Sequence, residues 1–292
     1  MPIDRAHAWF RLGVWAILMV GAWQLLPDRY MGPFAAWNPH AIMEFVVTIF
    51  SISIAGKLAV RWLGAHDGLL LTGLMGGFAS STATIHAMGR LAKSTPALAR
   101  RAALGGVISN SATLVQLVVL LKLLMPEVLT LLVQPLCFGM VGMLAYAGWV
   151  LTHNRDSDVT SVEMEASTVV DWKGLFTLTT LVCSVSYAAA ALNAQLGQAG
   201  LWIGAALSGL VDAHAIVPTL ASLTSQGHFL PHDAVMPLLI ALSANTLTKS
   251  LLALQSGGWI YARQVASGVW ITTVAVWLGY GSCCLRNGLD LC

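Results

Sequence analysis

Three ionisable side chains in apolar segments of the second half of the chain could bind an ion or carry a proton. Asp212 and His214 stand two residues apart in Ser208-Gly209-Leu-Val-Asp212-Ala-His214-Ala, and Lys249 lies in the next apolar segment. A charge in the middle of a membrane helix costs roughly 3 kcal/mol on insertion scales, so it persists only if it is paired, hydrated or neutralised. Two interpretations stay open: Asp212 serves an ion or proton pathway, or an Asp212–Lys249 ion pair only locks two helices together.

Two asparagines accompany these residues in apolar segments. Asn110 and Asn245 follow Gly77 and Gly209 by 33 and 36 residues, respectively. An asparagine amide can coordinate a cation through its oxygen, or it can form a hydrogen bond to a neighbouring membrane helix. Their recurrence in both halves of the chain favours a shared polar site.

A diglycine followed by hydroxyl groups marks the first half. Gly76-Gly77 can open a helix and free backbone carbonyls, and non-helical backbone at membrane depth is tolerated where it lines a polar cavity or is buried in protein. Four hydroxyls fall within the next few residues, at Ser80, Ser81, Thr82 and Thr84. We expect helix breaks near Gly77 and Gly209 whose carbonyls and hydroxyls line an ion site. The alternative is that the glycines only allow close helix packing.

The chain that positions these residues is strongly apolar. Hydrophobic residues make up 57% of its 292 residues and charged residues only 10%, against about 25% charged residues in soluble domains. Apolar runs of about 20 residues recur, each long enough to cross a bilayer as a helix. We predict an all-α integral membrane protein with about nine transmembrane helices, at residues 9–26, 42–63, 69–89, 102–124, 129–151, 174–195, 201–223, 234–254 and 264–283.

The two halves of the chain repeat one another. Residues 45–64 align without gaps onto 178–197, and short gaps bring Gly77 onto Gly209 and Asn110 onto Asn245. Because four crossings return a chain to its starting side, we expect two parallel four-helix repeats and not inverted ones. The predicted divisions are an N-terminal helix and loop at 1–41, a first repeat at 42–152, an acidic linker at 153–171, and a second repeat with the C-terminal tail at 172–292.

No motif indicates an enzyme. The sequence lacks a nucleophile elbow, a zinc-protease helix motif and a phosphate-binding loop, and its five cysteines show no ligand-like spacing. A net charge of +2 gives no basis for nucleic-acid binding. We expect no cofactor other than a bound ion of unknown identity. The expected partners are the lipid bilayer and a small inorganic ion, and a homodimer is compatible with so small a fold.

Two groups of motifs resemble the membrane domain of unknown function attached to many MgtC/SapB-family bacterial proteins. The first half contributes Leu26-Pro27-Asp28-Arg29, Asn38-Pro39 and Gly68-Leu-Leu-Leu-Thr72-Gly73-Leu-Met-Gly76-Gly77-Phe-Ala-Ser80-Ser81-Thr82-Ala-Thr84. The second contributes Ala206-Leu207-Ser208-Gly209-Leu210-Val211-Asp212 and Ala244-Asn245-Thr246-Leu247-Thr248-Lys249. The resemblance implies an inner-membrane protein linked to ion homeostasis. His214 stands where the family pattern has a second aspartate, and no MgtC-type domain is present in this sequence, so a magnesium role is not implied.

Together these features predict a transporter or channel for a small ion, a cation in the first instance, in the bacterial inner membrane. The expected site combines the charge of Asp212, the amides of Asn110 and Asn245, and the backbone and hydroxyls of the two glycine motifs. The competing interpretation is a membrane scaffold or regulatory subunit whose polar residues only join helices.

Overall fold

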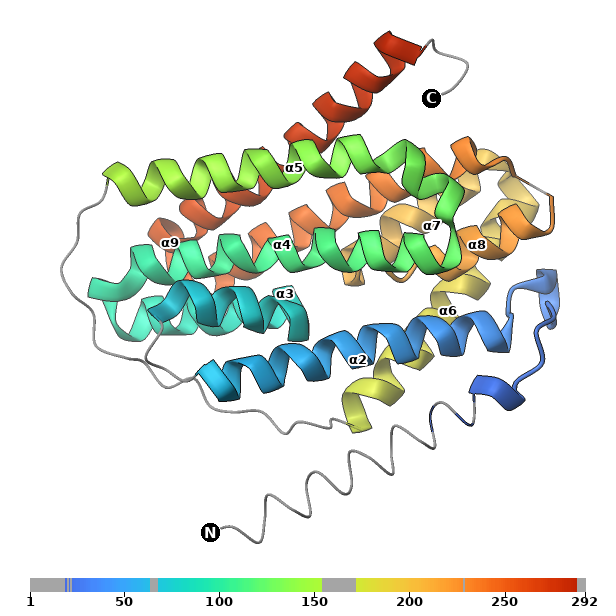
Figure 1. The fold of residues 1–292 in the computed structure, drawn as a ribbon, viewed down its shortest axis with the longest axis horizontal. Helices are drawn as coiled ribbons and strands as arrows, with labels where there is room; N and C mark the ends of the chain where they lie inside the picture. The colour runs from blue at the N-terminus through green and yellow to red at the C-terminus, as the bar shows by residue number, and fades with distance from the viewer. Residues whose placement is uncertain are drawn as a thin grey trace, which may run out of the picture.

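The described part of the chain is built from helices (Figure 1). A computed structural model describes residues 19, 21, 23–63, 68–153, 172–227 and 229–287. The only β-type pairing among these residues is an isolated bridge between Met31 and Trp37. The α-helices are α2 (Pro39–Leu63), α3 (Gly68–Ser94), α4 (Ala99–Leu124), α5 (Pro126–His153), α6 (Trp172–Leu196), α7 (Gln198–Val211), α8 (Val217–Ser225) and α9 (Val235–Asn287).

The structure confirms an all-α chain of the multi-pass membrane type. Six helical segments of the described residues are long and apolar enough to cross a bilayer: Pro39–Ala59, Gly68–Ser94, Pro96–Leu124, Pro126–His153, Lys173–Leu196 and Pro231–Arg286. The count of nine transmembrane helices stays a prediction. The predicted span at 9–26 falls mostly outside the described residues, and so does the acidic linker after His153.

Helix α3 folds back on itself at Ser80. This residue has extended backbone angles, φ −173° and ψ 112°, inside an otherwise helical segment. A Cβ added to Gly76 would lie 2.8 Å from the hydroxyl of Thr84, although eight residues of straight helix would separate the two positions by about 12 Å. The arms 68–79 and 81–94 therefore lie side by side, and α3 is a hairpin.

Glycines let this hairpin pack directly on the backbone of α4. A Cβ at Gly73 would lie 2.3 Å from the carbonyl oxygen of Gly105, and one at Gly77 would lie 2.4 Å from that of Ser109. The returning arm reaches the same place, because a Cβ on Gly105 would be 3.2 Å from the terminal methyl of Met88. No side chain larger than hydrogen fits at Gly73 or Gly77.

The second half contains a matching hairpin made of α7 and α8. Helix α7 runs back along α6, where a Cβ at Gly204 would lie 2.9 Å from the Cβ of Ala189. The backbone is extended at Asp212, with φ −154° and ψ 130°. The chain then returns along α6, where the hydroxyl of Thr219 on α8 donates a 3.0 Å hydrogen bond to that of Ser186.

The long helix α9 also reverses, at Gly258, whose φ of 74° is left-handed. The hydroxyls of Thr246 and Thr273, 27 residues apart, are 2.7 Å from one another. Since 27 residues of straight helix span about 40 Å, the arms 235–257 and 259–287 are antiparallel neighbours. They contain the last two predicted spans.

Helix α4 shows how the two halves are oriented. A Cβ at Gly106 would lie 3.3 Å from Val265, and one at Gly268 would lie 2.5 Å from Val107. Residue numbers therefore increase in the same direction along α4 and the second arm of α9, so these two segments are parallel. Helix α4 is consequently antiparallel to the first arm of α9. Figure 1 shows α3 toward one end of the bundle and the α7–α8 pair toward the other.

The prediction of two parallel four-helix repeats is therefore wrong. The segments 69–89 and 201–223, expected to be straight helices, are helical hairpins whose two arms run in opposite directions. Each repeat then has three long helical segments besides its hairpin: α2, α4 and α5 in the first, and α6 and the two arms of α9 in the second. Because α4 is antiparallel to its counterpart, the first arm of α9, the second repeat is inverted relative to the first.

Candidate ion-binding site

At each hairpin tip a side-chain oxygen accepts a hydrogen bond from a backbone N–H that follows it closely in the chain. Ser80 accepts a 3.2 Å hydrogen bond at its hydroxyl from the backbone N–H of Ala83. The carboxylate of Asp212 accepts one of 2.7 Å from the backbone N–H of His214. The Ser80 hydroxyl caps the start of the second arm of α3, whereas Asp212 closes a turn before α8, whose N-cap residue is Ile216. The helix breaks expected near Gly77 and Gly209 thus occur three residues after each glycine.

A side-chain donor on the following helix fastens each tip. Gln116 Nε2 donates to the carbonyl of Phe78 over 3.1 Å, and Thr248 Oγ1 donates to that of Leu210 over 2.8 Å. Both pairs are 38 residues apart in the sequence. Corresponding positions of the two repeats here are consequently 132 residues apart.

This offset corrects the alignment of the two asparagines. Asn245 corresponds to Thr113, and Asn110 corresponds to Leu242. The gapped alignment placed Asn110 on Asn245 because it matched identical residue types, whereas the hairpins keep their spacing without a gap. Spacing supports this correction: Thr113 follows Gly77 by 36 residues, as Asn245 follows Gly209.

The carbonyls at the breaks are occupied, contrary to the expectation that they face an ion. Besides the two bonds above, Ser53 Oγ donates to the carbonyl of Ala79 over 3.1 Å and Asn245 Nδ2 donates to that of Gly209 over 3.2 Å. The glycines serve close packing, since a Cβ at Gly209 would lie 2.1 Å from the carbonyl oxygen of Ala241.

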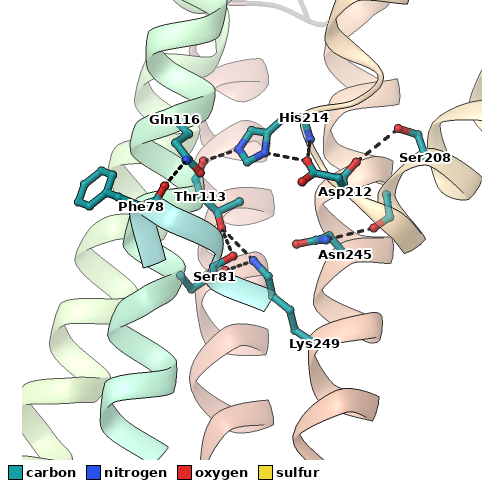
Figure 2. Close-up of polar contacts among 11 residues, drawn as sticks. Phe78, Ser81, Thr113, Gln116, Ser208, Asp212, His214, Asn245 and Lys249 are labelled. Carbon is teal, nitrogen blue, oxygen red and sulfur yellow. Dashed lines mark hydrogen bonds and ion pairs between the residues drawn. The ribbon is translucent and has the colours of Figure 1, made fainter. Parts of the chain in front are cut away.

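His214 joins the tip of the second hairpin to α4 of the first repeat (Figure 2). Its Nδ1 lies 2.8 Å from Oδ1 of Asp212, and its Nε2 lies 3.1 Å from the backbone carbonyl of Thr113. The His214 side chain is 7% exposed and that of Asp212 is 39% exposed. The imidazole is thus enclosed between two acceptor atoms, while the carboxylate retains an open side.

Lys249 is buried, with only 1% of its surface exposed. Its ammonium donates to Asn110 Oδ1 over 2.7 Å and to Thr113 Oγ1 over 2.9 Å. No ion pair joins Lys249 to Asp212 in the described structure, where the carboxylate pairs with His214. The alternative of a locking Asp212–Lys249 bridge is therefore not realised, and neutral oxygens hold the ammonium.

Thr113 is the residue at which these contacts converge. Its hydroxyl lies 2.9 Å from that of Ser81 at the tip of α3 and accepts the bond from Lys249, while its carbonyl faces His214. Figure 2 shows side chains of α3, α4, α9 and the α7–α8 turn pointing toward this one place.

A small polar cavity adjoins this network. Its volume is about 10 Å³, which is room for about one water molecule. Its polar lining comes from α4 and both arms of α9: Asn110, Thr113, Asn245, Thr246, Thr272 and Thr273. Asn110 and Asn245 thus share one cavity although they are not equivalent in the repeats.

The remaining predicted residues shape the hairpins instead of entering the network. Ser80 is exposed at its tip, Thr82 is half-buried, and Thr84 is buried against Gly76. The prediction did not include Thr113 and Gln116, because neither belongs to the glycine motifs or to the pair of asparagines on which it was built. Their signal was positional, since each lies 132 residues before a polar residue of the second half.

The fold and the network define a class of protein: an all-α, multi-pass membrane protein with inverted repeats, each containing a broken helical hairpin. The chain belongs to the family described as a domain of unknown function (DUF4010), whose model matches residues 47–257. No curated protein matches the chain, and no solved structure does. The relation to MgtC/SapB-family proteins stays a prediction.

Proposed function

We propose that this protein is a secondary transporter for a small ion, with its binding site between the two hairpin tips. The observation that carries the proposal is that the tips of two broken hairpins, one from each inverted repeat, both bond to Thr113 of α4 beside buried ionisable groups. Transporters of several folds bind their substrates where discontinuous helices of inverted repeats meet. Ionisable residues at membrane depth generally mark ion or proton pathways.

The charges of the network suit a monovalent ion. It contains one carboxylate, one imidazole and one ammonium, at Asp212, His214 and Lys249. Divalent cations are usually held by several carboxylates. Nowhere in the described residues do three or more aspartate, glutamate, histidine or cysteine side chains lie close enough together to hold a metal ion. The oxygens of the adjoining cavity are possible ligands of a cation, whereas the buried ammonium of Lys249 would attract an anion, so the test must include both.

The hydrogen bonds suggest a route for alternating access. Each tip is fastened within its own repeat, the first by Gln116 and Ser53 and the second by Thr248 and Asn245. At the site, the repeats are joined by the bonds that reach one turn of α4. Relative movement of the repeats can break those bonds while each hairpin keeps its shape. A cavity for a single water molecule supports a carrier rather than an open channel.

We place the transporter in the bacterial inner membrane as a multi-pass protein. The proposal rests on the apolar helices and on the family resemblance. The bilayer is its surroundings and a small inorganic ion its ligand, and no part of it requires an enzymatic step.

Flux through proteoliposomes tests the proposal. Purified full-length protein is reconstituted, and tracer uptake is measured for Na⁺, K⁺, Mg²⁺ and chloride, with a pH-sensitive dye for H⁺. We expect accelerated uptake of a monovalent ion, reduced at least tenfold in Lys249→Met. The matched control is Ser250→Ala, because Ser250 lies beside Lys249 on α9 and bonds only to the carbonyl of Thr246.

The competing scaffold function predicts a different outcome. In that case no ion moves, and Lys249→Met changes only the thermal stability. Flux that is equal in empty vesicles and in vesicles containing the protein, for every ion of the panel, would refute the transporter.

A further inference from the structure

We infer that Asp212 and His214 together bind one exchangeable proton, and that this proton holds the tip of the second hairpin against α4. Proton binding stands on the geometry of the pair alone. The additional statement that the proton is the coupling ion of transport rests on the proposed function.

The inference follows from which atoms can donate a hydrogen bond. The carbonyl oxygen of Thr113 only accepts, so Nε2 of His214, 3.1 Å away, must carry a hydrogen. A neutral imidazole has one N–H, and this contact uses it. Nδ1 nevertheless lies 2.8 Å from Oδ1 of Asp212. A second hydrogen must lie between these two atoms, either on Nδ1 or on the carboxyl oxygen.

The pair therefore holds one proton more than a neutral imidazole and a free carboxylate. An imidazolium with a carboxylate and an imidazole with a carboxylic acid are both neutral overall. Oδ1 of Asp212 also accepts the backbone N–H of His214 over 2.7 Å, which favours the ionised carboxylate. The protonated pair is thus neutral overall, whereas loss of the proton leaves a net charge of −1 in the bundle.

Loss of this proton breaks one of the two contacts of the imidazole. If the remaining hydrogen is on Nδ1, the Nε2 lone pair faces the carbonyl of Thr113. If it is on Nε2, the Nδ1 lone pair faces the carboxylate. Either arrangement places two acceptors about 3 Å apart without a hydrogen between them, which is repulsive. Deprotonation therefore weakens the link between His214 and the first repeat.

The pair is one of two titratable groups in the network. Lys249 on α9 is the other charged member of the network. On α4, the backbone carbonyl of Thr113 contacts the imidazole, and the Thr113 hydroxyl contacts that of Ser81 on α3. On α6, Ser186 accepts a hydrogen bond from Thr219 of α8. These neighbouring groups are uncharged. Of the pair, Asp212 has the more accessible side chain, 39% exposed against 7% for His214.

Spectroscopy of the full-length protein tests proton binding without any transport assay. With ¹⁵N-labelled histidine, we expect two protonated ring nitrogens for His214 in the acidic part of a pH 5–9 series and one after loss of a single proton. If the proton resides on the carboxyl group, an infrared carboxylic-acid band should appear instead and be absent in Asp212→Asn. Asp233→Asn, in the loop before α9, is the control for that substitution. A neutral imidazole together with an ionised carboxylate at every pH overturns the inference.

Coupling is tested separately in the proteoliposomes. In the wild type, an outward gradient of the ion that the flux panel identifies should drive protons across the membrane, either in the same direction as the ion or in the opposite direction. His214→Gln keeps a donor for the carbonyl of Thr113 but cannot carry the proton, so we expect proton movement per transported ion to fall at least tenfold. His153→Gln, at the exposed end of α5, is the control. Unchanged proton movement in His214→Gln refutes coupling through this pair, whereas absence of all ion flux refutes the proposed function and leaves the spectroscopic result standing.

Discussion

Replacement of Gly209 by alanine should destabilise the protein, because its Cβ has no room. The added carbon would lie 2.1 Å from the carbonyl oxygen of Ala241, whereas carbon–oxygen contacts are comfortable at about 3.3 Å. Helices α7 and α9 must therefore separate by roughly 1 Å. A shift of that size removes the bonds from Thr248 to Leu210 and from Asn245 to Gly209, now 2.8 Å and 3.2 Å long.

The magnitude follows from three contributions. Overpacking costs about 2 kcal/mol, and two lost hydrogen bonds cost about 1 kcal/mol each. The better helix propensity of alanine returns about 1 kcal/mol. The net loss is about 3 kcal/mol, which lowers the midpoint of thermal unfolding by about 6–12 °C for a protein of this size.

Thermal unfolding in detergent, followed by intrinsic tryptophan fluorescence, measures this loss. Gly148→Ala on α5 is the matched control, because an added Cβ there meets no atom within 4 Å. That control should be stabilised by about 0.5–1 kcal/mol. A Gly209→Ala protein that melts at or above the wild-type temperature, as Gly148→Ala should, would contradict the close packing of the hairpin on α9.

Three further predictions concern the hairpins and the network. Thr113→Val should lower the free energy of unfolding by about 1–3 kcal/mol, because Lys249 loses a hydrogen-bond acceptor. The ¹⁵N signals of His214 should not change, because His214 bonds to the backbone carbonyl of Thr113 and not to its hydroxyl. Altered signals would contradict this independence of the two contacts. Gln116→Leu and Thr248→Val should each lower the free energy of unfolding by about 1–2 kcal/mol. Because the two hydrogen bonds lie in different repeats, the double mutant should lose the sum of the two values within about 0.5 kcal/mol. A larger coupling energy in the double-mutant cycle would contradict independent fastening of the two tips. Cysteines at Thr246 and Thr273 should form a disulfide on mild oxidation in a variant without the natural cysteines, detected by mass spectrometry, whereas a straight α9 would hold them about 40 Å apart.

The class of fold was predictable from composition because a bilayer selects long apolar helices. The breaks were predictable too, since the glycines are followed closely by Ser80 and Asp212, whose side-chain oxygens bond to nearby backbone N–H groups and compete with a continuous helix. The orientation of the repeats was not. A 27-residue apolar segment such as α3 is long enough to cross the membrane once or to enter and return, and hydropathy does not distinguish these paths.

The members of the network were predictable only where they are unusual in lipid. Asp212, His214, Lys249 and Asn110 were candidates because polar side chains are rare at membrane depth. Thr113 escaped because a threonine in a membrane helix usually bonds to its own backbone. Its importance depends on three partners from distant parts of the chain, which appear together only after folding.

The two halves, related by an offset of 132 residues, have divided their chemistry unequally since duplication. Asp212, His214 and Lys249 correspond to Ser80, Thr82 and Leu117, so one copy owns every ionisable group of the centre and the other supplies neutral partners. Two inverted repeats can swap conformations, each adopting the shape that the other had. The ionisable side chains, however, stay in the second repeat. In the proposed transporter, the inward-facing and outward-facing forms would therefore be chemically distinct, and we expect the affinity for the ion to differ between the two sides of the membrane.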